Sequence, residues 1–147
     1  MEKSVDSLVG HFYETFDIKP QDVRNYSPLT LAYIGDAVYE IIIRTMIIEK
    51  GNAPVNKLHK RCASLVKASA QAALVLKIEP LLTEDEMHIF KRGRNAKSYT
   101  TAKNASMIDY RMATGFEALV GYLYLNGKFE RLFELIKEGL EQQERKK

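Results

Sequence analysis

Cysteine and histidine are scarce in this sequence. The 147 residues include one cysteine, Cys62, and three scattered histidines, His11, His59 and His88. A single cysteine excludes a disulfide framework within the chain and any zinc cluster built on several cysteines. The histidines lack a ligand spacing such as His-x-x-x-His, so they do not indicate a zinc site either. We therefore expect a protein of a reducing compartment, located in the cytoplasm.

Long apolar runs are also missing. The longest nearly uncharged stretch, residues 37–48, contains Glu40 and Arg44, so no segment reaches the ~20 apolar residues that cross a bilayer. The first 16 residues mix acids with apolar side chains and lack the apolar core of a secretory signal. With 46% hydrophobic residues in 16.8 kDa, the chain is expected to form one soluble domain with its own core.

The net charge of +3 is small, but the positive charges are unevenly distributed. Residues 50–78 contain six lysines and arginines and no acid, and residues 87–108 contain five more, again with no acid. One interpretation is that these basic blocks are solvated helix faces. The other is a surface that faces a polyanion, because clustered Lys and Arg gain affinity by releasing counterions from phosphates. Charge alone does not decide between them.

Apolar residues recur with helical spacing along almost the whole chain, as at Leu8, Phe12 and Phe16. The apolar run 41–43 has no second strand-like run to pair with, so we predict an all-α fold. The predicted segments are helices near residues 8–16, 28–50, 55–77, 83–92, 112–125 and 129–143, with a polar loop at 93–106.

Cap residues mark the start of two of these helices. Ser27 and Pro28 are typical of a helix cap and first turn, and Thr83 precedes a helix with acids at its start and bases at its end. The helix after Pro28 is apolar around most of its circumference, which predicts a central, largely buried position. Inner faces are expected for the third and last helices at Val55, Leu58, Cys62 and Leu65, and at Phe133, Ile136 and Leu140.

Two acids stand in the most apolar helices, Asp36 within LAYIGDAVY and Glu117 within TGFEALVGYLYL. We expect both to be at least partly buried, and a buried carboxylate needs a cation or several donors to compensate its charge. Each acid alone is explained by a local backbone contact or by pairing with Arg44 or Arg111. Two such acids together favour a shared metal ion. Oxygen ligands without histidine or cysteine indicate magnesium or manganese.

Glycines accompany both acids. Gly35 precedes Asp36, and Gly115 and Gly121 flank Glu117 on either side, although glycine is unfavourable inside a helix. Such glycines usually permit two helix backbones to approach closely. We therefore expect them to bring the two acids together.

These segments resemble a known family. LAYIGDAVYE (31–40) looks like the helix that identifies ribonuclease III nuclease domains, and FEALVGYLYLNG (116–127) is similar to the family's second acidic helix. The order and separation of the two segments also agree. The GRNAKS stretch and the ATGFEALVGYLYL helix resemble the short bacterial branch, Mini-ribonuclease III, which consists of the nuclease domain alone. The resemblance covers residues from about 27 to 140.

The resemblance implies an all-α homodimer that cleaves double-stranded RNA with magnesium, for which manganese can substitute. It assigns metal binding and catalysis to Asp36 and Glu117. Residues 21–147 would form the nuclease domain, and residues 1–20 a helical extension with no assigned role. The implied substrate is precursor large-subunit ribosomal RNA, with a ribosomal protein as helper. No second RNA-binding module is expected after the nuclease domain.

Two other functions stay open. One is a non-catalytic RNA-binding or assembly module, because Leu29, Ala32 and Thr114 stand where full-length enzymes of the family carry further acids. The other is a helical protein-interaction domain. The Mini branch shows a similar loss of acids, so activity is still expected, with either one or two metal ions. Thr114 is a candidate to bind a metal-coordinated water, and Glu40 is a candidate outer partner of the metal or a surface or dimer-contact residue.

Two surfaces follow from the same reasoning. The stretch KRGRNAK and its neighbourhood combine arginines, lysines and a glycine, which suits phosphate contacts along an RNA duplex. A dimer contact is expected on the helix after Pro28, where Tyr33, Ala37 and Ile41 offer more apolar surface than one core needs. The RNA-binding candidates are Lys91, Arg92, Arg94, Asn95, Lys97 and Lys103.

Overall fold

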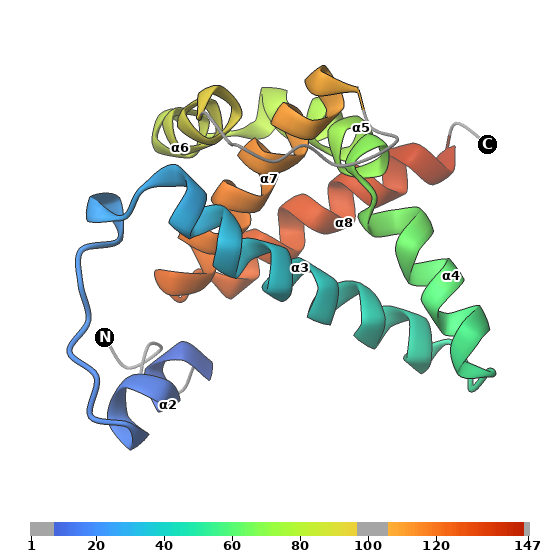
Figure 1. Ribbon diagram of the computed structural model, residues 1–147, viewed down its shortest axis with the longest axis horizontal. Helices are drawn as coiled ribbons and strands as arrows, with labels where there is room; N and C mark the ends of the chain where they lie inside the picture. Colours follow the sequence, from blue (N-terminus) through green and yellow to red (C-terminus); the bar gives the residue numbers. More distant parts are fainter. Residues whose placement is uncertain (1–7, 97–105, 146–147) are drawn as a thin grey trace.

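The structure, a computed structural model, describes residues 8–96 and 106–145, with side chains to residue 141 (Figure 1). All regular structure in these ranges is helical, which confirms the predicted all-α fold. The elements in chain order are α2 (Leu8–Thr15), the 3-10 turn η1 (Val23–Asn25), α3 (Pro28–Glu49), α4 (Val55–Val66), α5 (Ala68–Ile78), the 3-10 turn η2 (Glu79–Leu81), α6 (Glu84–Asn95), α7 (Met107–Leu125) and α8 (Phe129–Arg145).

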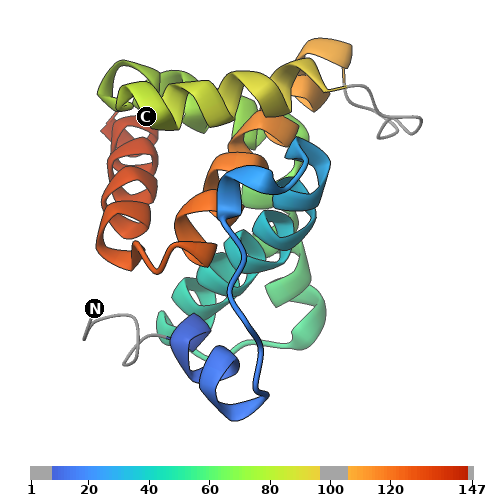
Figure 2. The same cartoon turned by 90° about the vertical axis from the view of Figure 1, so that its left-hand side faces the viewer.

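Helix α7 is the centre of the fold. Between Ala113 and Tyr124 every residue except Glu117 is buried, because α3, α5 and α6 pack around this helix (Figure 1). Tyr39 of α3 meets Phe116 of α7 edge to face, with 5.0 Å between ring centroids. Figure 2 shows α2 at one end of the molecule and α6 at the opposite end. The buried core therefore runs along α7, and the other helices are layers on it.

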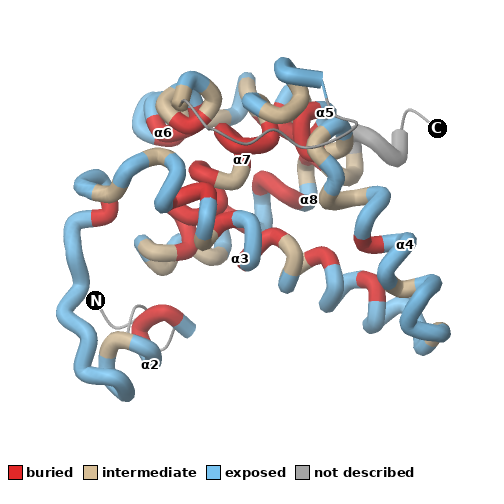
Figure 3. Tube along the Cα trace, viewed as in Figure 1, coloured by how far each residue is buried: buried red, intermediate tan, exposed pale blue. Residues whose placement is uncertain are grey.

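Helix α3 is central but only half buried, so the prediction of burial around most of its circumference is wrong. Leu31, Tyr39 and Ile43 face α7 and are fully buried. On the opposite side Tyr33 is 81% exposed and Ile41 is 63% exposed. The reason is that α3 packs on α7 along one face, and α4, which also contacts α3, leaves Tyr33 and Ile41 uncovered among the described residues. Figure 3 shows the alternation of buried and exposed positions along this helix.

The predicted helix at 55–77 is two helices. Lys67 has an extended backbone (ψ 157°), which ends α4 and begins α5 in a new direction. The Gln71 side chain bridges this corner by donating a hydrogen bond to the Val66 carbonyl at 2.7 Å. Because the chain turns here, α4 has a single fully buried residue, Cys62, and Val55 is exposed instead of facing the core.

The caps at Ser27 and Thr83 are confirmed. The Ser27 hydroxyl accepts from the Thr30 amide, and Thr83 and Glu86 form a reciprocal capping box. Helix α7 begins at Met107, five residues before the predicted position, because Ser106 caps it. Helix α6 continues to Asn95, so residues 93–95 are helical and not part of a loop. Gly93 belongs to α6, and its backbone packs directly against Gly115 of α7. A larger side chain at this position would not fit between the two helices.

The predicted inner stripe of α8 is confirmed at Ile136, which is buried, and at Leu140, which packs half-buried on the core, but it is wrong at Phe133, which is exposed. Leu132 and Leu135 are buried in addition. Helix α8 is held to α6 by Arg131, whose guanidinium donates to both carboxylate oxygens of Glu86 at 2.9 and 2.8 Å. Burial alone would raise the pKa of Glu86, but Arg131 and the Thr83 amide hold that pKa below its usual value. This buried ion pair had no signal in the sequence.

Among the described residues, no helix is both long enough and apolar enough to cross a membrane.

Candidate metal centre

The centre forms where α3 crosses α7. A Cβ added at Gly35 would lie 1.8 Å from the Glu117 carbonyl oxygen, and one at Gly121 would lie 2.0 Å from the Leu31 carbonyl oxygen. The two backbones are therefore in direct contact, and only glycine fits at these positions. This confirms the expected role of Gly35 and Gly121. Gly115 instead accommodates Phe90 of α6, so its assignment to the α3 contact is wrong.

The crossing places the Asp36 and Glu117 side chains against each other. Asp36 follows Gly35, and the Glu117 carbonyl rests on Gly35, so the two carboxyl groups reach hydrogen-bonding contact. Burial, the charge of Asp36 and the hydrogen bond with Asp36 raise the pKa of Glu117 to about 8. The Glu117 carboxyl group therefore resists ionisation beside Asp36.

The two acids differ in exposure. Glu117 is partly buried between α3 and α5, whereas Asp36 is exposed, contrary to the expectation that both would be partly buried. Asp36 is exposed because it lies at the margin of the α3 face that packs on α7. One side of the pair is therefore open to a ligand from solvent.

Arginine does not neutralise this pair within the described residues. Arg44 forms an ion pair with Glu40 at 2.8 Å and not with Asp36. Neither Asp36 nor Glu117 forms an ion pair there, with Arg111 or with any other cationic side chain. The explanation of each acid by an arginine partner is thus not supported.

Gln71 of α5 is a further member of the centre that the sequence analysis missed. Its side chain is buried, and its amide nitrogen donates to Glu117 Oε2 at 3.3 Å as well as to the Val66 carbonyl. Its amide oxygen is buried without a hydrogen-bond partner among the described groups. The only sequence signal is an amide in the otherwise apolar segment ASAQAALVLKI.

The donors present fit a hard divalent cation. No metal-binding group of three or more His, Cys, Asp or Glu side chains occurs in the described ranges, so the protein itself offers two carboxylates. Magnesium commonly binds through one or two carboxylates and completes its octahedron with water and substrate phosphate oxygens. A dication between Asp36 and Glu117 would also remove the repulsion that raises the pKa of Glu117.

The sequence linked four further positions to the metal centre: Thr114, Glu40, Leu29 and Ala32. The Thr114 side chain is buried one turn before Glu117, and its hydroxyl donates to the Tyr110 carbonyl at 3.0 Å. Glu40 is half-buried and held by Arg44. At the other two positions, Leu29 is exposed and Ala32 is buried.

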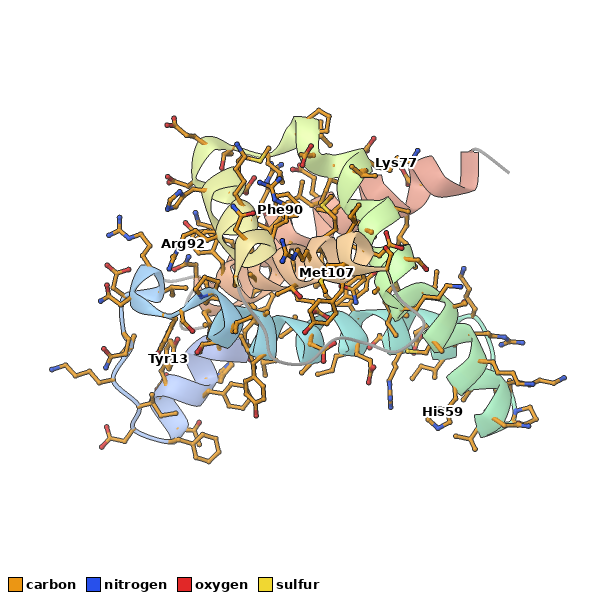
Figure 4. All side chains as sticks on the ribbon, turned by 45° about the horizontal axis from the view of Figure 1, so that its top comes forward. Tyr13, His59, Lys77, Phe90, Arg92 and Met107 are labelled. Carbon is orange, nitrogen blue, oxygen red and sulfur yellow. The ribbon has the colours of Figure 1, made fainter. Side chains whose placement is uncertain are left out.

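Four of the RNA-binding candidates, Lys91, Arg92, Arg94 and Asn95, lie in the last turns of α6. Gly93, between the two arginines, packs against Gly115 and the Thr114 carbonyl of α7. Arg94 lies over the Phe90 ring, 5.7 Å from its centroid. Figure 4 shows Arg92 and Phe90 on this helix, with His59 on α4 at the other side of the molecule. Lys91 and Asn95 are exposed, whereas Lys97 and Lys103 lie outside the described residues.

Most of the chain matches a known protein family. A sequence profile described as "Ribonuclease III domain" matches residues 29–128, a range that contains both carboxylates and the basic end of α6.

Individual relatives indicate the branch of this family to which the chain belongs. The Mini-ribonuclease 3 of Clostridium tetani is 58% identical over 80% of this chain and 78% of the relative. That of Thermoanaerobacter sp. is 52% identical over 92% of this chain and 94% of the relative. A crystal structure of a protein from Fusobacterium nucleatum superposes with a TM-score of 0.74 at 33% identity, covering 80% of this chain and 95% of that one. The chain belongs to the Mini-ribonuclease 3 branch of the ribonuclease III family, and it is a nuclease.

Proposed function

We propose that the chain is a magnesium-dependent endoribonuclease that cleaves double-stranded RNA in the cytoplasm and matures precursor large-subunit ribosomal RNA. The observation that carries this proposal is the contact between the Asp36 and Glu117 carboxyl groups at the α3–α7 crossing. The Mini-ribonuclease 3 relatives support the choice of RNA as substrate.

Asp36 and Glu117 are the residues that would hold the metal. A bound magnesium or manganese ion supplies a Lewis acid for the phosphate and lowers the pKa of a coordinated water. Glu117 anchors the site from the buried side, and exposed Asp36 leaves the other side open to a phosphodiester backbone. The chemistry requires no histidine, which fits a chain with three scattered histidines.

The cations of α6 bind the RNA backbone in this proposal. Arginines suit bidentate phosphate contacts, and Arg92 and Arg94 flank Gly93 on α6, the helix that packs on α7 at Gly115. Lys91, Asn95, Lys97 and Lys103 would extend this surface. Thr114 and Glu40 have outer roles, Thr114 toward a metal-coordinated water and Glu40 toward Asp36 or the surface.

The active form in this proposal is a homodimer paired through the exposed face of α3, with a ribosomal protein on the RNA as helper. Tyr33, Ala37 and Ile41 recur every four residues on that face, so they form one continuous apolar stripe.

The test is cleavage of a short RNA duplex by Asp36→Asn. We expect cleavage with magnesium to be abolished while binding of the duplex in EDTA stays within about twofold of wild type, because the substitution removes a metal ligand and no phosphate contact. Asp85→Asn, at an exposed aspartate in the first turn of α6, is the matched control and should cleave normally. A wild-type chain that binds the duplex without cutting it would favour the non-catalytic module. A chain that neither binds nor cuts would favour the protein-interaction domain.

A further inference from the structure

Gln71 makes two different contacts with one amide group. Its nitrogen donates one hydrogen bond to the Val66 carbonyl at 2.7 Å, at the corner between α4 and α5. The same nitrogen donates a second to Glu117 Oε2 at 3.3 Å, across to α7. Both amide hydrogens are thus engaged, and the side chain links the corner to the carboxylate pair.

The Val66 carbonyl fixes which way the amide points. If the amide were reversed, its oxygen would face the Val66 carbonyl, which is an acceptor and cannot donate to it. The nitrogen therefore faces Glu117, and the amide oxygen faces away from both partners. That oxygen is buried and unpartnered among the described groups, and a buried acceptor without a donor is unfavourable.

A bridge between α4 and α5 alone does not account for this arrangement. The contact with Val66 needs one amide hydrogen, and an apolar side chain would fill the same space without leaving a buried acceptor. The second donor holds one oxygen of Glu117, so the carboxylate that meets Asp36 is restrained from the α5 side.

We propose that Gln71 is a positioning residue of the metal centre, which orients the Glu117 carboxylate through its amide nitrogen. This inference rests on the proposed function, because it assumes that Asp36 and Glu117 hold a divalent ion. Groups that orient metal ligands in this way commonly contribute about tenfold or more to metal affinity.

The test is manganese binding to the full chain without RNA, followed by the electron paramagnetic resonance of free Mn²⁺. Gln71→Met keeps the volume of the side chain and removes both amide contacts. We expect it to weaken manganese binding by about tenfold or more, while duplex RNA binding in EDTA is unchanged. Leu74→Val is the matched control, because Leu74 is buried on α5 but faces Gly139 of α8, and it should bind manganese like wild type.

The outcomes separate the two proposals. If wild type binds manganese, Asp36→Asn does not and Gln71→Met binds like wild type, the inference about Gln71 is overturned and the metal centre stands. If wild type binds no manganese, the metal centre fails and the inference with it.

A second measurement needs no variant at position 71. In the ¹⁵N–¹H spectrum of the wild-type chain, the Gln71 side-chain amide signals should shift during a magnesium titration, with the midpoint of the other site signals. Signals that stay in place while those of Glu117 shift would overturn the proposal even if Gln71→Met does not fold.

Discussion

Glu117 carries an electrostatic cost that an exposed glutamate does not have. Its carboxyl group is partly buried beside Asp36, and both burial and the neighbouring charge disfavour ionisation. In the unfolded chain the same group is solvated and ionises near its ordinary pKa of 4.5. The metal-free protein therefore folds against this cost at neutral pH.

The first prediction concerns the pH dependence of stability without metal. Between the unfolded pKa of 4.5 and the folded pKa of about 8, the folded chain retains a proton that the unfolded chain releases. Stability should fall as the pH rises through this window, by up to about 1.4 kcal/mol per pH unit. Glu117→Gln should lose this slope and become more stable than wild type at pH 8. Urea unfolding in EDTA at pH 5, 6.5 and 8 measures the effect.

The control for this prediction is Glu130→Gln, at an exposed glutamate in the first turn of α8, which should keep the wild-type slope. Equal slopes for wild type and Glu117→Gln would contradict the assignment of the cost to Glu117.

The second prediction concerns Arg92 and Arg94. Replacing both with alanine should weaken binding of a short RNA duplex, because fewer phosphates are then neutralised by the protein. The slope of log K against log [salt] should become shallower by about 1 for each arginine that binds a phosphate in the wild type. The comparison is Lys19→Ala with Lys128→Ala, which removes the same charge from exposed positions outside both basic blocks. A salt slope that is the same in both double variants would exclude the two arginines from the phosphate contacts.

At the scale of the helices, the close approach of α3 and α7 requires glycine where the two backbones touch. The third prediction is that Gly121→Ala costs about 3 kcal/mol or more of unfolding free energy, because the new Cβ would meet the Leu31 carbonyl at 2.0 Å. Gly139→Ala should cost less, about 1 kcal/mol, because its Cβ meets side-chain atoms of Leu74 and not a main-chain carbonyl. Urea unfolding followed by circular dichroism compares the two, and equal costs would contradict the backbone contact.

The sequence predicted the helices well where local chemistry decides them. Ser27 and Thr83 act through hydrogen bonds to residues three positions on, so a cap can be read locally. The break at Lys67 has no such signal, because lysine is a good helix former and apolar residues continue on both sides. The exposure of Phe133 was missed for a related reason, since apolar periodicity does not show which face finds a partner.

Part of the candidate site could also be predicted, because a local sequence signal indicated it. Glycines beside Asp36 and Glu117 indicated a close helix contact, and the contact brings the two acids together. Gln71 has no comparable signal, because an amide within an apolar helix does not reveal what it faces. Its place in the site depends on the turn at Lys67, which directs α5 across α7.

At the scale of the whole molecule, the exposed face of α3 is the largest departure from a self-sufficient core. Tyr33 and Ile41 project from it, and Ile41 also lines an apolar groove of ≈ 680 Å³ with Phe133 and Leu140 of α8. Apolar surface of this kind typically marks a protein contact.

The fourth prediction tests this face as the dimer contact. Wild type should sediment as two chains at micromolar concentration, and Tyr33→Glu should sediment as one chain, because a carboxylate in the centre of an apolar contact is left without a partner. Tyr110→Glu, at the start of α7 and away from this face, should leave the mass unchanged. A wild-type monomer at micromolar concentration would contradict the predicted dimer.

The direct contact of main chains at Gly35 has a consequence for heating. Asp36 is the next residue, and the carbonyl of Glu117 rests on the glycine, so no long or flexible linkage separates the two acids. Their main chains part only when the central helix pair comes apart, and that event removes the core around α7. The centre thus has no melting point of its own, and a warmed sample should contain either intact centres or denatured chains.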